Sequence, residues 1–340
     1  MRKFVTCLFL GLLALSACRS GGDGAGQKAD SDTTRIRLEV LNQQIEDDAE
    51  NPELYNRRAK YLLGDHQFDK ALKDIKMAIS LDDKKSGYYI TLSDIYLLMG
   101  QTEISRDGLK KAIAINPREK EAFLKLAKLY LIVKDYPNCY ATVKQLLDLD
   151  KSFADAYYTR AIGLLEQGDT IHAVDDLMQA VDKNQQYYEA YIQLGELHSI
   201  KKSPLAELYL KNALNIRPQS KEAMYMLGMF YQETGQYTKA IATYQNLGKV
   251  DTSFREAPYN IGYIYLVYLN DFSRAIPFFT ESLKKDPGYY QAYFNRGYAY
   301  ELLGEYKNAM DDYQRSLKIM VNYDKAIEGL NRLDKVKVRK

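Results

Sequence analysis

The sequence predicts an all-α protein made of about eight repeated helix pairs, and two periodic series of residues support this prediction. Mostly aromatic residues recur every 34 residues, with one-residue shifts late in the chain: Tyr55, Tyr89, Phe123, Tyr157, Tyr191, Met224, Pro258 and Tyr293. Four positions after each of them stands a small residue: Ala59, Ser93, Ala127, Ala161, Gly195, Gly228, Gly262 and Gly297. Small residues are needed where two helices approach closely, so this pattern predicts tightly packed helix pairs.

A second series of small residues lies in the other half of each unit: Ala71, Ser105, Cys139, Ala173, Ala206, Ala240, Ala275 and Ala309. Prolines at positions 117, 218 and 287 fall at unit ends, where a helix must stop. The expected units span 52–85, 86–119, 120–153, 154–187, 188–220, 221–254, 255–289 and 290–323. The fifth is one residue short near Ser203-Pro204, and the seventh carries an extra residue near Asn270-Asp271.

This pattern resembles the tetratricopeptide repeat, a helix–turn–helix unit of 34 residues that stacks into a solenoid. The last unit matches best, with Ala292, Tyr293, Gly297, Tyr300, Gly304, Tyr306, Ala309 and Tyr313 in the motif positions. The resemblance covers residues 52–323 and implies a right-handed solenoid that binds proteins. Amphipathic helices are expected on both sides of it as caps, over 34–51 and 324–340.

The N-terminus is typical of an exported protein. Arg2 and Lys3 precede an apolar run over residues 4–15, which is a secretory signal in layout and too short to span a membrane. The following Leu15-Ser16-Ala17-Cys18 resembles a bacterial lipobox, which implies a signal peptide over 1–17 and acylation of Cys18, including palmitate. The alternative is an ordinary signal peptide that leaves Cys18 as a free thiol. The glycine-rich residues 18–33 then read as a flexible tether.

The composition offers little for catalysis. Loss of residues 1–17 leaves equal numbers of basic and acidic residues, so no basic footprint for nucleic acid remains. His66, His172 and His198 lie in different units without metal-ligand spacing, and Cys139 belongs to a close-packing series. We therefore expect no catalytic residue, no cofactor, no metal site and no small-molecule substrate. Acidic pairs such as Asp175-Asp176 and Asp311-Asp312 are expected to be solvated.

The resemblance places the second, fifth and ninth residues of each first helix on a concave groove. The fifth and ninth positions become apolar and aromatic toward the C-terminus. The expected partner-binding residues are Tyr158, Ile162, Ile192, Tyr225, Met229, Tyr259, Tyr263, Phe294 and Tyr298. Large exposed apolar groups usually mark a binding site, although curvature or the terminal helix could instead cover part of this set. The second positions form an acidic row: Glu53, Glu121, Asp155, Glu189, Glu222 and Glu256.

These observations predict a non-catalytic adaptor, anchored by lipid in a bacterial envelope, on the periplasmic face of the outer membrane. An amphipathic helix or an extended apolar segment of a partner protein would occupy the groove. Assembly of secretion, pilus or other envelope machinery is the expected setting. The alternative is an outer-membrane glycan-binding lipoprotein. Such proteins also use these repeats but commonly carry Trp and large insertions, whereas this chain has no Trp and nearly gapless units.

Overall fold

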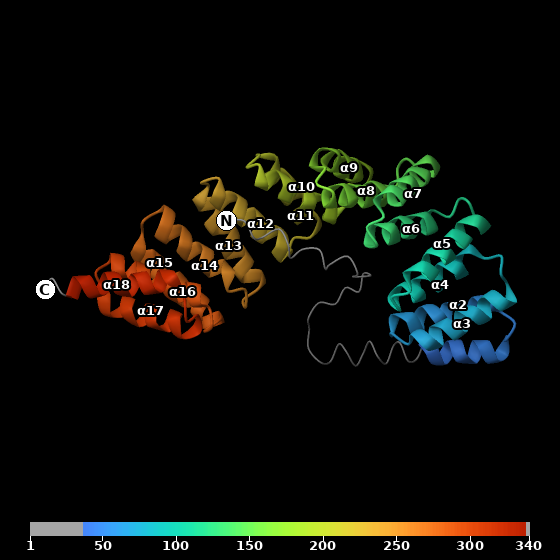
Figure 1. Ribbon diagram of the computed structural model, residues 1–340, viewed down its shortest axis with the longest axis horizontal. Coiled ribbons are helices and arrows are strands. Elements are labelled where there is room, and N and C mark those ends of the chain that lie inside the picture. The colour runs from blue at the N-terminus through green and yellow to red at the C-terminus, as the bar shows by residue number, and fades with distance from the viewer. Residues whose placement is uncertain (1–36, 338–340) are drawn as a thin grey trace. The chain divides into compact units, whose positions relative to one another are not determined.

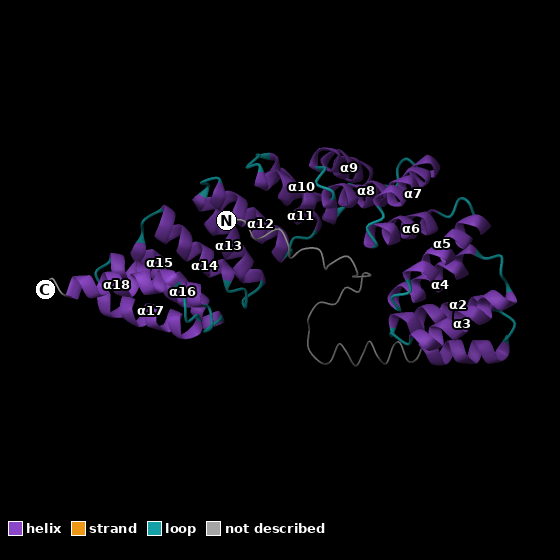
Figure 2. Cartoon of the chain, viewed as in Figure 1, coloured by secondary structure: helices purple, strands orange, loops and turns teal. Residues whose placement is uncertain are grey.

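The structure is a computed structural model that describes residues 37–337. Every regular element within that range is helical, and the described residues contain no strand (Figure 2). This confirms the predicted all-α fold of repeated helix pairs. Contacts divide the described residues into two compact units, 37–133 and 134–337. The division falls between the two helices of the repeat expected over 120–153.

The first unit begins with a helix over residues 37–47, where Leu41 and Ile45 are buried. This helix lies in the range expected for the N-terminal cap. It is followed by α2 (Pro52–Gly64), α3 (Phe68–Leu81), α4 (Ser86–Leu98), α5 (Thr102–Ile115) and α6 (Lys120–Ile132) (Figure 1).

The second unit continues the alternation of short helices. It contains α7 (Tyr136–Leu149), α8 (Ala154–Glu166), α9 (Thr170–Lys183), α10 (Tyr188–Ile200), α11 (Leu205–Ile216), α12 (Lys221–Glu233), α13 (Tyr237–Val250), α14 (Glu256–Tyr263), η1 (Ile264–Tyr268), α15 (Phe272–Lys285), α16 (Tyr290–Leu302), α17 (Tyr306–Ile319) and α18 (Asp324–Lys337). The even-numbered helices α2 to α16 are the first helices of the repeats, and the odd-numbered helices α3 to α17 are the second helices. Helix α18 lies in the range expected for the C-terminal cap.

The turn between the two helices of each repeat contains one residue with positive φ. These residues are His66, Gly100, Lys134, Gly168, Lys202, Gly235, Asn270 and Gly304. A left-handed residue after the last turn ends a helix and lets following N–H groups reach its final carbonyls. After α12, for example, the N–H of Gln236 donates to the carbonyl of Tyr231 at 2.8 Å. One left-handed position per repeat is therefore what reverses the chain.

The small residues of the first helices lie where buried side chains of the second helices leave little room. A Cβ added to Gly228 would lie 2.6 Å from the ring of Tyr244, and one added to Gly297 would lie 3.1 Å from the ring of Tyr313. Both rings are completely buried. In an earlier repeat, where the buried partner is the aliphatic Leu177, Ala161 takes the place of glycine. The small residues therefore lie at close contacts between paired helices, as the sequence predicts.

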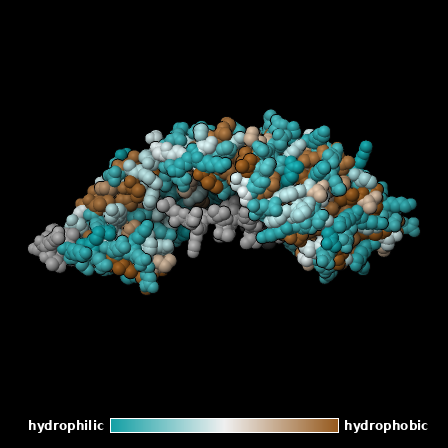
Figure 3. Space-filling view, turned by 45° about the horizontal axis from the view of Figure 1, so that its top comes forward, coloured by the Kyte–Doolittle hydropathy of each residue, from teal (hydrophilic) through white to brown (hydrophobic). Residues whose placement is uncertain are grey.

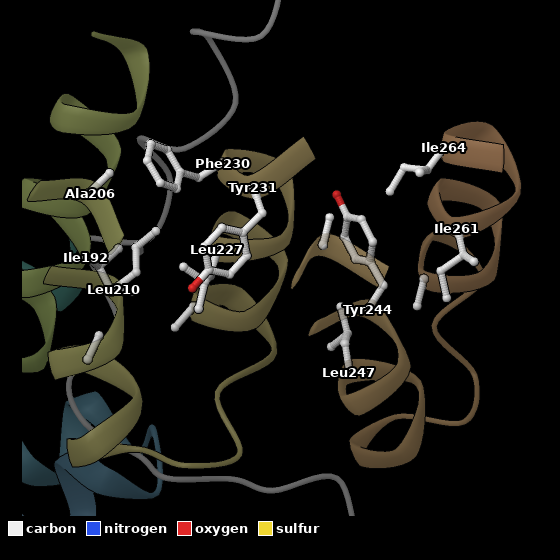
Figure 4. Close-up of a cluster of buried hydrophobic side chains, with 14 of the residues drawn as sticks. Ile192, Ala206, Leu210, Leu227, Phe230, Tyr231, Tyr244, Leu247, Ile261 and Ile264 are labelled. Carbon is white, nitrogen blue, oxygen red and sulfur yellow. The ribbon is translucent and has the colours of Figure 1, made fainter. Parts of the chain in front are cut away.

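The core of the second unit lies between the first and second helices and forms several clusters along the stack. Figure 4 shows part of it, in which Leu210, Leu227, Tyr244 and Ile261 come from successive helices and point toward one another. The Tyr244 hydroxyl donates to Oε1 of Gln232 at 3.3 Å, so a polar atom in this layer has a partner.

The two irregular repeats are accommodated in different ways. In the fifth repeat the shortening falls on the second helix, because α11 has twelve residues whereas α9 and α13 have fourteen. In the seventh repeat, the π-helix η1 accommodates the extra residue. Its hydrogen bonds join residues five apart, so each bonded turn contains one residue more than in an α-helix. The sequence placed that residue near Asn270. The structure corrects this, because Asn270 has the left-handed turn position that Gly235 occupies one repeat earlier.

Candidate protein-binding face

In the second unit, the closest contacts between alternate helices lie on the side of the first helices. Helix α10 contacts α12, and α16 contacts α18, whereas no two consecutive second helices in the described residues approach as closely. A stack of helices curves toward the side on which its members are closer. The first helices therefore line the inner side of the second unit. The expected partner-binding residues all lie on these helices, and we call their side the first-helix face.

The fifth-position rings of this face each pack against an aromatic residue that precedes the next first helix or cap. The ring centroids are 5.0 Å apart for Tyr158 and Tyr187, 5.7 Å for Tyr225 and Phe254, 4.8 Å for Tyr259 and Tyr289, and 5.4 Å for Phe294 and Tyr323. Aromatic pairs at such distances add to the stability of a packed contact. These rings are joints between repeats, and only part of each is exposed.

The hydroxyl groups of these tyrosines are protonated at physiological pH. Burial raises the pKa of Tyr158 to about 12, and it also raises the pKa of Tyr225 and Tyr259 above the usual value for tyrosine. Tyr259 accepts a hydrogen bond from Nδ2 of Asn295 at 2.8 Å. Each ring therefore carries a neutral hydroxyl that can donate a hydrogen bond at the edge of the face.

The remaining residues of the expected set differ in exposure. The side chains of Ile162 and Ile192 are buried, with 4% exposure each, so they support the face from below. Met229, Tyr263 and Tyr298 are half-buried and reach its surface. Tyr263 stacks on Tyr259 at 6.4 Å, and Tyr298 lies nearly parallel to Phe294 at 6.2 Å. Of the expected set, Met229, Tyr263 and Tyr298 and the edges of the fifth-position rings therefore remain accessible.

The acidic row is bound into the solenoid. The Tyr187 hydroxyl donates to Asp155 at 3.2 Å, and the Tyr188 hydroxyl donates to Glu222 at 3.1 Å. Ion pairs join Glu189 to Arg217 at 2.7 Å and Glu256 to Arg255 at 3.0 Å. Four of these six carboxylates therefore already have partners within the chain, and two of the four partners are positively charged.

Glu196 is different from the acidic row. It is half-buried at a ninth position, and burial followed by the charge of Glu222 raises the pKa of its carboxyl. In the part of the chain that the structure describes, it makes no hydrogen bond or ion pair. A cation brought by a partner would relieve the cost of burying this carboxylate.

Three Arg–Asp pairs were not found from the sequence, and they correct the expectation that Asp176 and Asp312 are solvated. Both carboxylates are buried, and each accepts hydrogen bonds from an arginine sixteen residues earlier. The pairs are Arg58 with Asp74, Arg160 with Asp176, and Arg296 with Asp312. The signal that could have found them is an Arg and an Asp recurring together at the same two positions of the first, fourth and eighth units.

Candidate catalytic groups are dispersed or buried. Cys139 is completely buried, and burial raises the pKa of its thiol to about 12, so it stays protonated and unreactive. Within residues 37–337, no group of three or more His, Cys, Asp or Glu side chains is arranged to hold a metal ion. His66 has the left-handed turn position of its repeat.

The expected signal peptide, Cys18 and the tether lie outside the described residues. No described helix is both long and apolar enough to cross a membrane. Apolar residues are interspersed with polar ones on the face shown in Figure 3.

Family models of the tetratricopeptide repeat match residues 264–326 and residues 209–242. Both ranges lie within the series of helix pairs described above. The chain therefore contains tetratricopeptide repeats. Repeats of this family form scaffolds for protein–protein interaction. The coarse functional prediction is therefore borne out.

Several known proteins are similar to this tetratricopeptide-repeat protein. DnaJ homolog subfamily C member 3 of Rattus norvegicus is 24% identical over 352 residues, covering 92% of this chain and 67% of the relative. The protein O-mannosyl-transferase TMTC3 of Homo sapiens is 21% identical over 243 residues, covering 70% of this chain and 26% of the relative. The crystal structure of YrrB, described as a TPR protein with an unusual peptide-binding site, covers 55% of this chain and 97% of YrrB at 18% identity, with a TM-score of 0.41.

Proposed function

We propose that this tetratricopeptide-repeat protein is a non-catalytic adaptor of the bacterial cell envelope. Lipid on Cys18 anchors it at the periplasmic face of the outer membrane, and the first-helix face of its second unit holds a segment of a partner protein. The lipobox-like Leu15-Ser16-Ala17-Cys18 supports the anchor. Multiple acyl chains give stable anchoring where a single chain gives only marginal binding.

The observation that carries the adaptor role is the repetition of an apolar ninth position on consecutive first helices. Met229, Tyr263 and Tyr298 reach the surface from α12, α14 and α16. The last two are backed by stacked rings, so little side-chain entropy is lost when a partner covers them. Aromatic residues held in this way are the common hot spots of protein interfaces.

The partner segment that fits this face is amphipathic. Its apolar side chains would cover the ninth positions of the sixth to eighth repeats. A Lys or Arg of the same segment would pair with Glu196, because that carboxylate has no partner in the described chain. A helix with one apolar stripe, or an extended apolar segment, meets both requirements.

Partner capture tests the adaptor role. A photo-crosslinking amino acid at position 229 of the full-length chain should trap one envelope protein, and Tyr263→Ser with Tyr298→Ser should remove that product. Residues Tyr259 and Phe294 are left intact because they join repeats. The matched control is Ile171→Ser with Ile200→Ser, which removes two strongly exposed apolar residues elsewhere. Equal cross-linking by both double variants would overturn the proposed face.

Fractionation tests the anchor separately. Cys18→Ala should move the protein from the membrane fraction to the soluble fraction, and metabolic labelling with a palmitate analogue should be lost with it. Retention of the variant in the membrane fraction would contradict the anchor, whatever the cross-linking result.

A further inference from the structure

A pocket of about 490 Å³ lies between the second helices α9 and α11. Tyr191 of the first helix α10 contributes to its wall. The pocket is built mainly from second helices and the loop at residues 185–186. Its lining therefore shares no residue with the apolar positions of the first-helix face, and the proposed adaptor role does not use it.

Side-chain amides dominate the polar lining of this pocket. Gln185 and Gln186 come from the loop after α9, and Asn212 and Asn215 come from α11. None of these four amides makes a hydrogen bond to any described part of the chain. Each amide offers two N–H donors and a carbonyl acceptor, so the four groups together can serve a ligand that both donates and accepts.

Two tyrosine rings form an aromatic wall in the same pocket. The rings of Tyr191 and Tyr209 have centroids 6.4 Å apart and are inclined by 35°. Tyr209 also packs against His198 at 5.3 Å, which holds its ring in place. Like the amides, both hydroxyls make no hydrogen bond within the described residues. The pocket thus combines fixed apolar ring faces with unpaired neutral polar groups.

The pocket is less basic than the corresponding surface of other repeats. Counted from the small residue of the second helix, Met178 has the position occupied elsewhere by Lys76, Lys110, Lys144 and Lys211. Asn215 likewise has the position of Lys249, Lys284 and Lys318. The carboxylate at the pocket, Asp182, is paired with Lys183 at 2.8 Å. A ligand for this pocket therefore needs no net charge.

We propose that this pocket binds a neutral oligosaccharide. Sugar hydroxyls donate and accept hydrogen bonds at once, as the four amides do, and the C–H face of a pyranose ring can lie on Tyr191 or Tyr209. The size of the pocket is in the range of sites for small ligands. A glycan site on the second helices goes beyond the adaptor role on the first-helix face.

The polar lining favours a sugar over a peptide. A peptide needs polar contacts for its backbone, which side-chain amides could provide. A peptide site also needs apolar pockets for alternate side chains, whereas most of this lining consists of amides and tyrosines.

Calorimetric titration of the full-length protein with cellopentaose, maltopentaose and chitopentaose tests this proposal. The detergent must lack a sugar head group, because such a head group would compete. We expect saturable binding of at least one pentaose. Gln185→Ala with Asn215→Ala, two exposed residues, should weaken it about tenfold, because lost hydrogen bonds of roughly 1.4 kcal/mol in total change affinity by that factor. Tyr209→Leu should abolish it.

The matched control is Gln245→Ala with Asn246→Ala, which removes two exposed amides from α13 and should bind as the wild type does. Circular dichroism melting shows whether each variant is folded. The absence of binding by all three sugars would overturn the proposal. A second outcome would also overturn it: an uncharged nonapeptide, selected from a library, binds the wild type but not the pocket variants. The pocket would then be a peptide site. Partner cross-linking at position 229 is unaffected by either outcome.

Discussion

The guanidinium of Arg296 donates two hydrogen bonds to Asp312, from Nε to Oδ2 at 2.7 Å and from Nη2 to Oδ1 at 2.8 Å. The two residues come from the paired helices α16 and α17, and their side chains are only 13% and 4% exposed. Nη1 of the same guanidinium donates to Oγ1 of Thr280 at 2.9 Å. This buried pair therefore fixes one helix against its partner, and also against the preceding repeat.

Removal of one member of this pair should be more damaging than removal of both. Asp312→Ala leaves Arg296 as an uncompensated buried cation, and we expect the free energy of unfolding to fall by about 3 kcal/mol. Arg296→Leu combined with Asp312→Thr reproduces the Leu227 and Thr243 that stand at these positions in the sixth repeat, and it should recover most of that loss. Urea denaturation measures both effects. A double variant less stable than Asp312→Ala would contradict this account.

The sequence predicts the helix pairs well because close packing limits residue size. Gly228 and Gly297 stand where a Cβ would strike a buried ring, so the period of small residues reports helix contacts directly. The burial of Asp312 was not predictable from its neighbours, since the adjacent Asp311 is exposed. Only the position of Arg296 on the facing helix makes burial of that carboxylate possible.

The left-handed turn position offers a stabilising substitution. Lys202 has a φ of 50°, whereas glycine stands at this position in four of the repeats. A left-handed conformation costs a residue with a side chain roughly 1–2 kcal/mol in the folded state, and glycine avoids this cost. Glycine also loses more conformational entropy on folding, which offsets part of the stabilisation. We expect Lys202→Gly to raise the free energy of unfolding by up to about 1 kcal/mol in urea denaturation.

The opposite substitution serves as the control for this turn. Gly304, with a φ of 78°, should lose stability as Gly304→Ala, although no atom lies close enough to clash with the new Cβ. Equal stability of Gly304→Ala and the wild type would show that the conformation of these turns carries little energy.

His198 should make the stability of the second unit fall as the pH falls. Its Nε2 is buried without a hydrogen-bond partner among the described residues, and burial, assisted by Lys201, lowers the pKa of the ring below 6.5. Below that pH the unfolded chain binds the proton more readily than the folded chain, so acidification favours unfolding. The melting temperature should therefore drop between pH ~7.5 and ~5.5.

His198→Tyr isolates this contribution, because tyrosine has the same position in the second, third, sixth, seventh and eighth repeats. The variant should lose the part of the pH dependence that comes from the ring, and the difference between the two proteins measures it. If the melting temperature falls by the same amount between the two pH values in the wild type and in the variant, the buried imidazole is not the cause.

The helices that carry the candidate residues were predictable, but the exposure of the side chains was not. The resemblance places Tyr259 and Phe294 on the first-helix face, and the structure places them on these helices. The rings that partly cover them, Tyr289 and Tyr323, come from segments about thirty residues further along the chain. Periodicity of the first helices carries no information about such contacts, so residues that join repeats and residues that reach the surface look alike in the sequence.

The π-helix of the seventh repeat should be removable without loss of the fold. Val267 lies within η1 and is 43% exposed, so its deletion removes the extra residue while Gly262 and the turn residue Asn270 keep their roles. We expect an α-helix in its place, with a free energy of unfolding at least equal to that of the wild type, because α-helical hydrogen bonds replace the rarer geometry. A crystal structure and urea denaturation check both parts.

Deletion of Gln193 from α10 is the control, because α10 has no extra residue. This deletion should shift Gly195 away from Leu210 and destabilise the unit. Equal damage by the two deletions would mean that η1 is required by the surrounding packing.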